Sequence, residues 1–293
     1  MEFRPTPVNW MVLGAMGAYV AAAVALGAGA LVGMRRTPGK AARALRLAGW
    51  ALYAAGFAIS LAAWLVRWHE VQHAPLQNLY EVFLTMGALM LPISLFCRLA
   101  LRVGAEWADA VLATVVLFPV AMVFNPDPQY LPAALQSPLF VPHVATYLAA
   151  YVILGKAAVQ AFWCLVCRPV ATGDSTGRAE LMGGTLGGGS AAQERATHTM
   201  VCFGFPLLTL GLVLGATWGK LAWGDYWNWD PKELWSLVSW LVFLAYLHFR
   251  AVRGKRSPVA GSLLVLMGTA CILITLLWAN LSSLFAGLHS YAR

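Results

Sequence analysis

Three tryptophans and two aspartates lie within the eight residues from Trp223 to Asp230, between two long apolar runs of the chain. Indole rings are favoured where one side is apolar and the other is wet. A cluster of them suits a flat, apolar ligand with an anionic edge, and haem has this shape. The segment therefore predicts a haem-binding surface formed by Trp223, Gly224, Trp227, Trp229 and Asp230.

A helix is predicted to begin directly after this segment. Asp230 can cap it, Pro231 fits its first position, and Glu233 can complete a capping box. The free amides and positive dipole end of such a helix can receive a carboxylate, for example a haem propionate. Trp227 and Trp229 share one face if the segment is extended. The alternative is a belt of interfacial tryptophans, which occurs in membrane proteins of any function and does not need this helix start.

Two histidines could supply both axial ligands of a haem iron. His143 follows Pro142, and His289 lies near the end of the sequence. Two neutral imidazoles on opposite faces of a porphyrin can ligate its iron while the indoles cover the macrocycle. The alternative for each histidine is a hydrogen-bonded group at a membrane interface. The pair is favoured because the topology inferred below brings both to the membrane face of the tryptophans.

His248 belongs to a different site or to none. It lies 17 residues beyond Pro231, which is about 25 Å along a helix. An ionisable side chain near the inner membrane boundary is costly unless it lines a cavity or has a partner, and His198 is one candidate partner. His69 and His73 are expected to remain in water. The spacing of Cys164 and Cys167 is typical of redox motifs, but packing in the core is favoured for them.

The composition identifies an integral membrane protein. The 293 residues are 60% hydrophobic and 11% charged, and the mean hydropathy is +0.68, values that exclude a soluble globular domain. We predict an all-α, polytopic bundle of about eight transmembrane helices. The apolar runs are 8–33, 46–66, 82–101, 108–124, 143–166, 199–219, 234–249 and 259–282. Runs 108–124 and 234–249 are marginal in length.

The distribution of lysine and arginine predicts the orientation. Most of them fall in the connections after the first, third, fifth and seventh runs, and short cytoplasmic loops accumulate these residues. Both termini, the tryptophan segment, His143 and His289 should therefore face outward. The net charge of +8 follows from this topology and favours contact with anionic lipid; it does not indicate nucleic-acid binding. The first run is expected to be retained as a span, without a signal peptide.

The glycine-rich stretch 170–197 is predicted to be a flexible cytoplasmic linker. It separates the first five helices, in residues 1–169, from the last three helices and the tryptophan segment, in residues 198–293.

Several segments resemble the CcsA (ResC) family of haem-handling cytochrome c biogenesis proteins. The strongest is the tryptophan-rich WWD motif Trp223-Gly-x-x-Trp-x-Trp-Asp230, which continues to Trp240 and to Tyr246-Leu-His248. The resemblance also covers 138–147, the terminal Gly287-Leu-His-Ser-Tyr291 and, more loosely, 74–81.

The resemblance implies that His143 and His289 are the axial ligands of an external haem held against the WWD loop. It further assigns His248 to a haem site within the membrane whose second ligand comes from a CcsB (ResB) partner. Such proteins are subunits of a holocytochrome c synthase, or haem lyase, and carry haem b outward. They present it to the Cys-x-x-Cys-His motif of apocytochrome c, which thiol-reducing proteins keep reduced. The expected location is a bacterial cytoplasmic membrane or a thylakoid membrane, with the WWD loop on the periplasmic or lumenal side.

Two other classes remain as alternatives. A b-type electron-transfer subunit would keep its haem permanently and should pair histidines on facing spans. A solute transporter should have broken spans or ionisable groups near mid-membrane, where Lys156 is the one obvious candidate.

Overall fold

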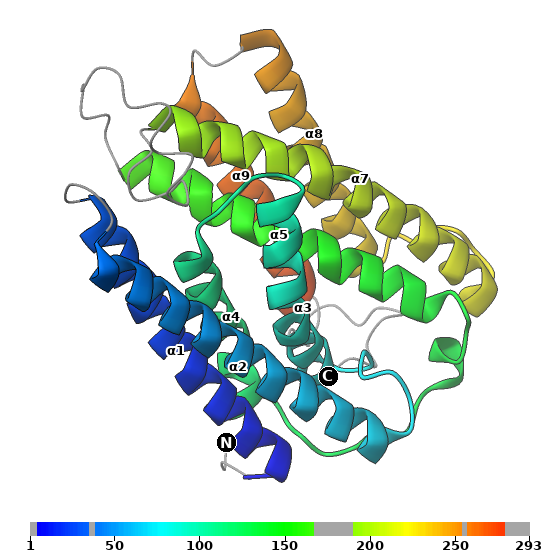
Figure 1. Cartoon of the computed structure of the whole chain (residues 1–293). Helices are drawn as coiled ribbons and strands as arrows, with labels where there is room; N and C mark the ends of the chain where they lie inside the picture. Colours follow the sequence, from blue (N-terminus) through cyan, green and yellow to red (C-terminus); the bar gives the residue numbers. More distant parts are fainter. Residues whose placement is uncertain (1–4, 35–38, 167–189, 254–256, 279–293) are drawn as a thin grey trace. The chain divides into compact units, whose positions relative to one another are not determined.

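The computed structural model describes residues 5–34, 39–166, 190–253 and 257–278. Every regular element in these ranges is helical (Figure 1). The elements are α1 (Pro7–Met34), α2 (Lys40–Val71), α3 (Leu79–Leu99), α4 (Glu106–Met122), η1 (Ala133–Leu135), α5 (Phe140–Val166), α7 (Ser190–Trp223), α8 (Pro231–Arg253), α9 (Pro258–Leu273) and η3 (Ile274–Trp278). They fall into an N-terminal unit, built from α1 to α4, and a C-terminal unit, built from η1, α5 and the elements after it.

The prediction of a helical membrane bundle is confirmed. Seven helices in the described part of the chain are long and apolar enough to cross a membrane. The run 234–249 is part of α8, which has 23 residues because polar residues extend the helix at both ends, from Pro231 to Arg253. The run 108–124 corresponds to α4, whose 17 residues extend about 25 Å, less than the thickness of a typical hydrocarbon core.

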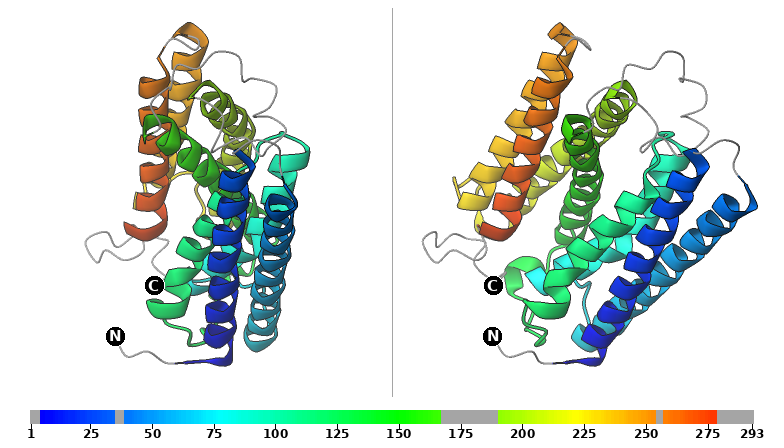
Figure 2. Two further views of the ribbon diagram at one scale, coloured as in Figure 1. Left: turned by 60° about the vertical axis from the view of Figure 1, so that its left-hand side comes forward. Right: turned by 90° about the vertical axis from the view of Figure 1, so that its left-hand side faces the viewer.

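Glycines of α2 allow α1 and α2 to lie close together in the N-terminal unit. A Cβ atom added at Gly49 would be 2.6 Å from Leu26, and one at Gly56 would be 2.8 Å from Tyr19. The contacts advance along α2 while they recede along α1, so the helices are antiparallel, and they lie side by side in Figure 2. Small residues at such an interface strengthen packing because apolar side chains alone gain little over lipid.

A buried ion pair joins three segments of the N-terminal unit. Arg67 on α2 is 1% exposed and Glu81 on α3 is 0% exposed. Both Nε and Nη2 of Arg67 donate to Oε1 of Glu81, at 3.2 and 2.9 Å. Nη1 donates to the carbonyl oxygen of Pro126 at 2.6 Å, and the guanidinium lies over the Tyr80 ring. This network connects α2, the start of α3 and the chain after α4.

Replacing Gly87 by alanine is expected to destabilise the N-terminal unit. The added methyl group would overlap the Leu117 side chain of α4, and overpacking of this kind costs about 1–3 kcal/mol. The free energy of unfolding, measured by denaturant titration in detergent micelles, should fall by this amount. Gly14→Ala is the matched control because nothing lies within 4 Å of its added Cβ. Equal effects of the two substitutions would contradict this packing.

Candidate functional site

Helices α5 and α7 pack as an antiparallel pair and position His143. Three glycines on one face of α7 oppose side chains of α5: Gly204 faces Leu154, Gly211 faces Tyr147, and Gly215 faces His143. Each step forward along α7 corresponds to an equal step back along α5. The absence of a Cβ atom at these positions lets side chains of α5 lie directly against the backbone of α7.

The imidazole of His143 has a defined tautomer and orientation. Its Nδ1 donates a hydrogen bond to the carbonyl oxygen of Gly211 at 2.9 Å, and a carbonyl can only accept. A neutral ring that donates through Nδ1 carries its lone pair on Nε2, which is then the atom able to bind a metal. A Cβ at Gly215 would be 2.5 Å from Cε1 of His143, so glycine is required for this ring position.

Trp218 connects His143 to the tryptophan segment. Its ring stacks on His143 with 5.7 Å between centroids and an interplanar angle of 22°. The same ring meets Trp223 edge to face at 4.7 Å, and Nε1 donates to Ala134 of η1 at 3.0 Å. Trp218 is 1% exposed. The structure thus brings together His143 and the beginning of the WWD motif through a residue that the sequence analysis did not single out.

One sequence signal could have identified Trp218. Gly211, Gly215 and Trp218 are spaced by four and three residues, which puts them on one face of a helix. The ring-stacking partner, however, comes from α5, and that contact is not readable from spacing along α7.

The backbone of the WWD loop is left-handed at two positions, so the condition of a fully extended segment, under which Trp227 and Trp229 would share a face, is not met. Helix α7 ends at Trp223, Gly224 has a φ of 93°, and Trp229 has a φ of 56° in the left-handed region. The rings of Trp227 and Trp229 meet edge to face, with centroids 5.9 Å apart, and Trp229 is 69% exposed. A non-glycine residue in the left-handed region stores strain that is typical of binding loops. Because of this exposure, the Trp229 indole is accessible to a ligand at the surface of the protein.

The predicted helix start after the loop is confirmed. Helix α8 begins at Pro231, and Oδ1 of Asp230 accepts from the amide of Lys232 at 2.9 Å. Oε2 of Glu233 accepts from the amides of Asp230 and Asn228, at 3.2 and 2.7 Å. The reciprocal bonds form a capping box. This capping box fixes the direction in which the WWD loop enters α8.

The remaining histidines have different surroundings. His248 is on an exposed face of α8, whereas Tyr246 of the same helix is buried. The ring centroid of His198 lies 6.1 Å from that of Tyr246. His198 therefore contacts the buried face of α8, whereas His248, for which it was a candidate partner, is on the exposed face. His289 and Cys167 lie outside the described residues.

His69 is exposed as expected, but the expectation that His73 remains in water is wrong. Its Nδ1 is 3.0 Å from the carbonyl oxygen of Ala74, and its Nε2 is buried. The short turn after α2 folds this ring against the chain, which sequence polarity alone does not reveal. Cys164 is buried, as the core-packing expectation requires.

These features define a class: helical membrane proteins with an oriented histidine beside an indole-rich loop. The family described as "Cytochrome C assembly protein" matches residues 76–289. The cytochrome c biogenesis protein CcsA of Crocosphaera subtropica is 32% identical over 287 residues, covering 77% of this chain and 82% of that protein. CcsA of Gloeobacter violaceus is 32% identical over 284 residues, covering 77% and 80%.

A solved structure has a similar fold. The cytochrome c haem lyase CcmF superposes with a TM-score of 0.58 at 18% identity, covering 95% of this chain and 51% of that one. At this identity the likeness concerns the fold alone. The chain belongs to the cytochrome c assembly protein family and is of the CcsA type, which confirms the resemblance drawn from the WWD motif.

Proposed function

We propose that this protein binds haem between His143 and the WWD loop and presents it for attachment to apocytochrome c. Family membership supports a role in cytochrome c maturation. The observation that carries the haem proposal is the hydrogen bond from Nδ1 of His143 to Gly211, because a neutral imidazole that donates through Nδ1 has its metal-binding lone pair on Nε2. In the proposal, His289 supplies the second axial ligand and haem b is the transported substrate.

The residues of the chain would mainly orient haem and exclude water. Trp218 stacks on His143 and restricts its rotation, so that the ligand is preorganised before haem arrives. The indoles of Trp223, Trp227 and Trp229 offer apolar surface for the porphyrin. The haem would supply the vinyl groups that form thioethers with the cysteines of apocytochrome c. An incoming histidine of the cytochrome would then replace one axial ligand of this protein.

A second haem position is proposed at His248. A histidine exposed on a membrane-spanning helix is costly in lipid. The face of α8 that carries it also exposes Leu241, Leu244 and Val252, an apolar stripe suited to a neighbouring transmembrane helix. We propose that a CcsB-type partner covers this stripe and provides the second ligand. The WWD loop would lie on the periplasmic or lumenal side, at the other end of α8.

The first test is the haem content of the purified full chain, alone and after coexpression with a CcsB-type partner. A pyridine haemochrome assay and the reduced-minus-oxidised spectrum should reveal low-spin haem in at least one preparation. His69→Ala is a suitable control because His69 is exposed and has no role in the proposal. The absence of haem from both preparations would refute haem handling and favour the transporter alternative.

Gly215→Ala tests the orientation of His143 without removing the ligand. The added methyl group must displace the imidazole, and loss of support for a metal ligand typically costs 10–100-fold in affinity. We expect haem retention to fall about tenfold and the low-spin absorption bands to shift. Gly219→Ala is the matched control on the same helix, since its added Cβ would make ordinary contacts of 3.4 Å or more. Equal haem retention by both variants would contradict the proposed role of Gly215 in positioning His143.

A further inference from the structure

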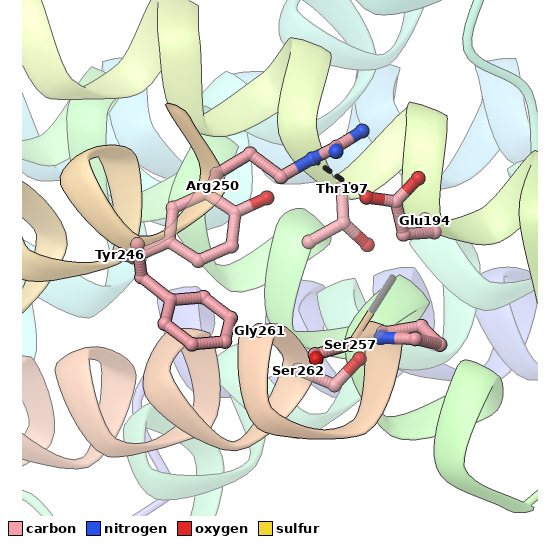
Figure 3. A pocket seen from close by; sticks show the side chains of 9 residues that line it. Glu194, Thr197, Tyr246, Arg250, Ser257, Gly261 and Ser262 are labelled. Carbon is pink, nitrogen blue, oxygen red and sulfur yellow. Dashed lines mark ion pairs between the residues drawn. The ribbon is translucent and has the colours of Figure 1, made fainter. Parts of the chain in front are cut away.

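A polar pocket lies where α7, α8 and α9 meet in the C-terminal unit (Figure 3). Each helix contributes polar residues to its lining: Glu194 and Thr197 from α7, Tyr246 and Arg250 from α8, and Ser257 and Ser262 from the start of α9. None of these residues takes part in the haem site described above. The enclosed volume is about 10 Å³, which is room for roughly one water molecule or one oxygen atom of a larger group.

The pocket lies toward the other end of α7 from Gly215, the position that faces His143. The spans of α7 and α9 begin beside it, and the span of α8 ends beside it. Thr197 is 18 residues from Gly215 along α7, a distance of about 27 Å. Charged residues at these helix ends, Glu194, Arg250 and Arg253, favour a position near the lipid headgroups over one in the hydrocarbon core.

The charges around the pocket favour an anion. Arg250 Nε is 2.7 Å from Glu194 Oε1, and both side chains are largely buried. The two groups are close enough to form an ion pair. Within the described residues, however, the Nε donor makes no hydrogen bond, because its N–H does not point at the carboxylate. Arg253 is exposed one turn after Arg250 on α8. Glu194 balances the charge of one of these two arginines, which leaves a net positive charge at this end of α8.

A buried hydroxyl group is available inside the pocket. Thr197 is 3% exposed, and its Oγ1 has no hydrogen-bond partner within the described ranges. In Figure 3 this hydroxyl lies on the side of α7 that faces Ser262 and Ser257. A buried hydroxyl without a partner destabilises the folded state, because it has lost its hydrogen bonds to water. A ligand oxygen in the pocket would remove that cost.

The start of α9 adds hydroxyl donors. Ser257 is its N-cap residue and makes no side-chain capping hydrogen bond, and Ser262 is 4% exposed; both line the pocket. Pro258 at the first helical position has no N–H, but the positive dipole end of this 16-residue helix attracts anions. Thr197, Arg250 and the two serines therefore bring hydrogen-bond donors to the pocket from three separate helices.

We propose that this pocket binds a phosphate oxyanion, with one oxygen in the enclosed space and the remainder of the group at the opening. Glu194 competes with the ligand for Arg250 and is the residue that limits affinity. The phosphate could come from the headgroup of a phospholipid or from inorganic phosphate in solution. Both sources carry the same phosphate oxygens, which accept hydrogen bonds. The position of the pocket near the polar ends of the helices favours the lipid headgroup.

The test measures lipid binding to the full-length, delipidated protein by native mass spectrometry. The probes are phosphatidylglycerol and a glucosyl diacylglycerol with the same acyl chains and no phosphate. We expect the wild-type protein to bind phosphatidylglycerol more tightly and Thr197→Val to weaken that binding about tenfold, which corresponds to roughly 1.4 kcal/mol. Thr199→Val is the matched control: it makes the same change two residues away, on the opposite side of α7, and should leave binding unchanged.

Glu194→Gln separates a binding role of Arg250 from a purely structural one. Removing the competing carboxylate should strengthen phosphatidylglycerol binding several-fold, whereas a structural ion pair would weaken it. Titration with inorganic phosphate distinguishes the sources: displacement of lipid by millimolar phosphate would assign the site to the free ion. Equal binding of the two lipids, or equal affinities of the Thr197→Val and Thr199→Val variants, would overturn the proposal and leave a water-filled pocket.

Discussion

Replacing His143 by alanine is expected to abolish haem retention at the outer site and, with it, cytochrome c maturation. The variant removes the one oriented imidazole that lies beside the WWD loop in the described residues. Loss of a supporting contact alone costs 10–100-fold in metal affinity, so loss of the ligand should exceed 100-fold. The measurement is haem per protein chain after purification with a CcsB-type partner, together with the yield of covalent haem on a coexpressed cytochrome c.

Two further variants make this experiment specific. Tyr147→Phe changes the neighbouring ring on α5, which meets His143 edge to face, and should keep most of the bound haem. His248→Ala should remove haem from the proposed inner position and leave the His143-dependent fraction in place. If His143→Ala retained as much outer-site haem as Tyr147→Phe, His143 would not be an axial ligand.

The parts of the site that depend on residues close together in the sequence could be predicted. The helix start at Pro231 and the roles of Asp230 and Glu233 were correct because a capping box is formed by residues within one turn. Trp218 was missed because its importance comes from α5, whose His143 is 75 residues away in the chain. The positive φ of Trp229 was also missed, since left-handed backbone is expected mainly at glycine or asparagine.

For the fold, too, the sequence predicted local features, the helices, but not the contacts between helices. Hydropathy identified the apolar runs, and long helices formed at each of them within the described residues. Hydropathy could not indicate that α5 packs with α7, because that contact depends on Gly204, Gly211 and Gly215 facing side chains of α5. Hydropathy also did not predict that Arg67 is buried. The run 46–66 ended one residue before it, whereas α2 continues to Val71 and buries the guanidinium.

Arg67→Met is expected to cause the largest loss of stability among single substitutions in the N-terminal unit. It would leave the Glu81 carboxylate buried after losing both hydrogen bonds from Arg67. Removing one partner of a buried ion pair typically costs about 3–5 kcal/mol. The free energy of unfolding, from titration of detergent micelles with a denaturing detergent, should fall by that amount, and the protein should accumulate less in membranes.

Two comparisons separate the buried charge from the general loss of an arginine. Arg98→Met removes an ion pair with Glu106 in the same unit, but the Arg98 side chain is 44% exposed and that of Glu106 is 11% exposed, against 2% and 0% for Arg67 and Glu81, so water reaches this pair and the loss should be smaller than for Arg67→Met. The double variant Arg67→Met, Glu81→Met removes both buried charges and should recover most of the stability, because paired apolar replacements of similar volume are often neutral. A double variant as unstable as Arg67→Met would mean that Pro126 and Tyr80, which also contact Arg67, determine its contribution instead of Glu81.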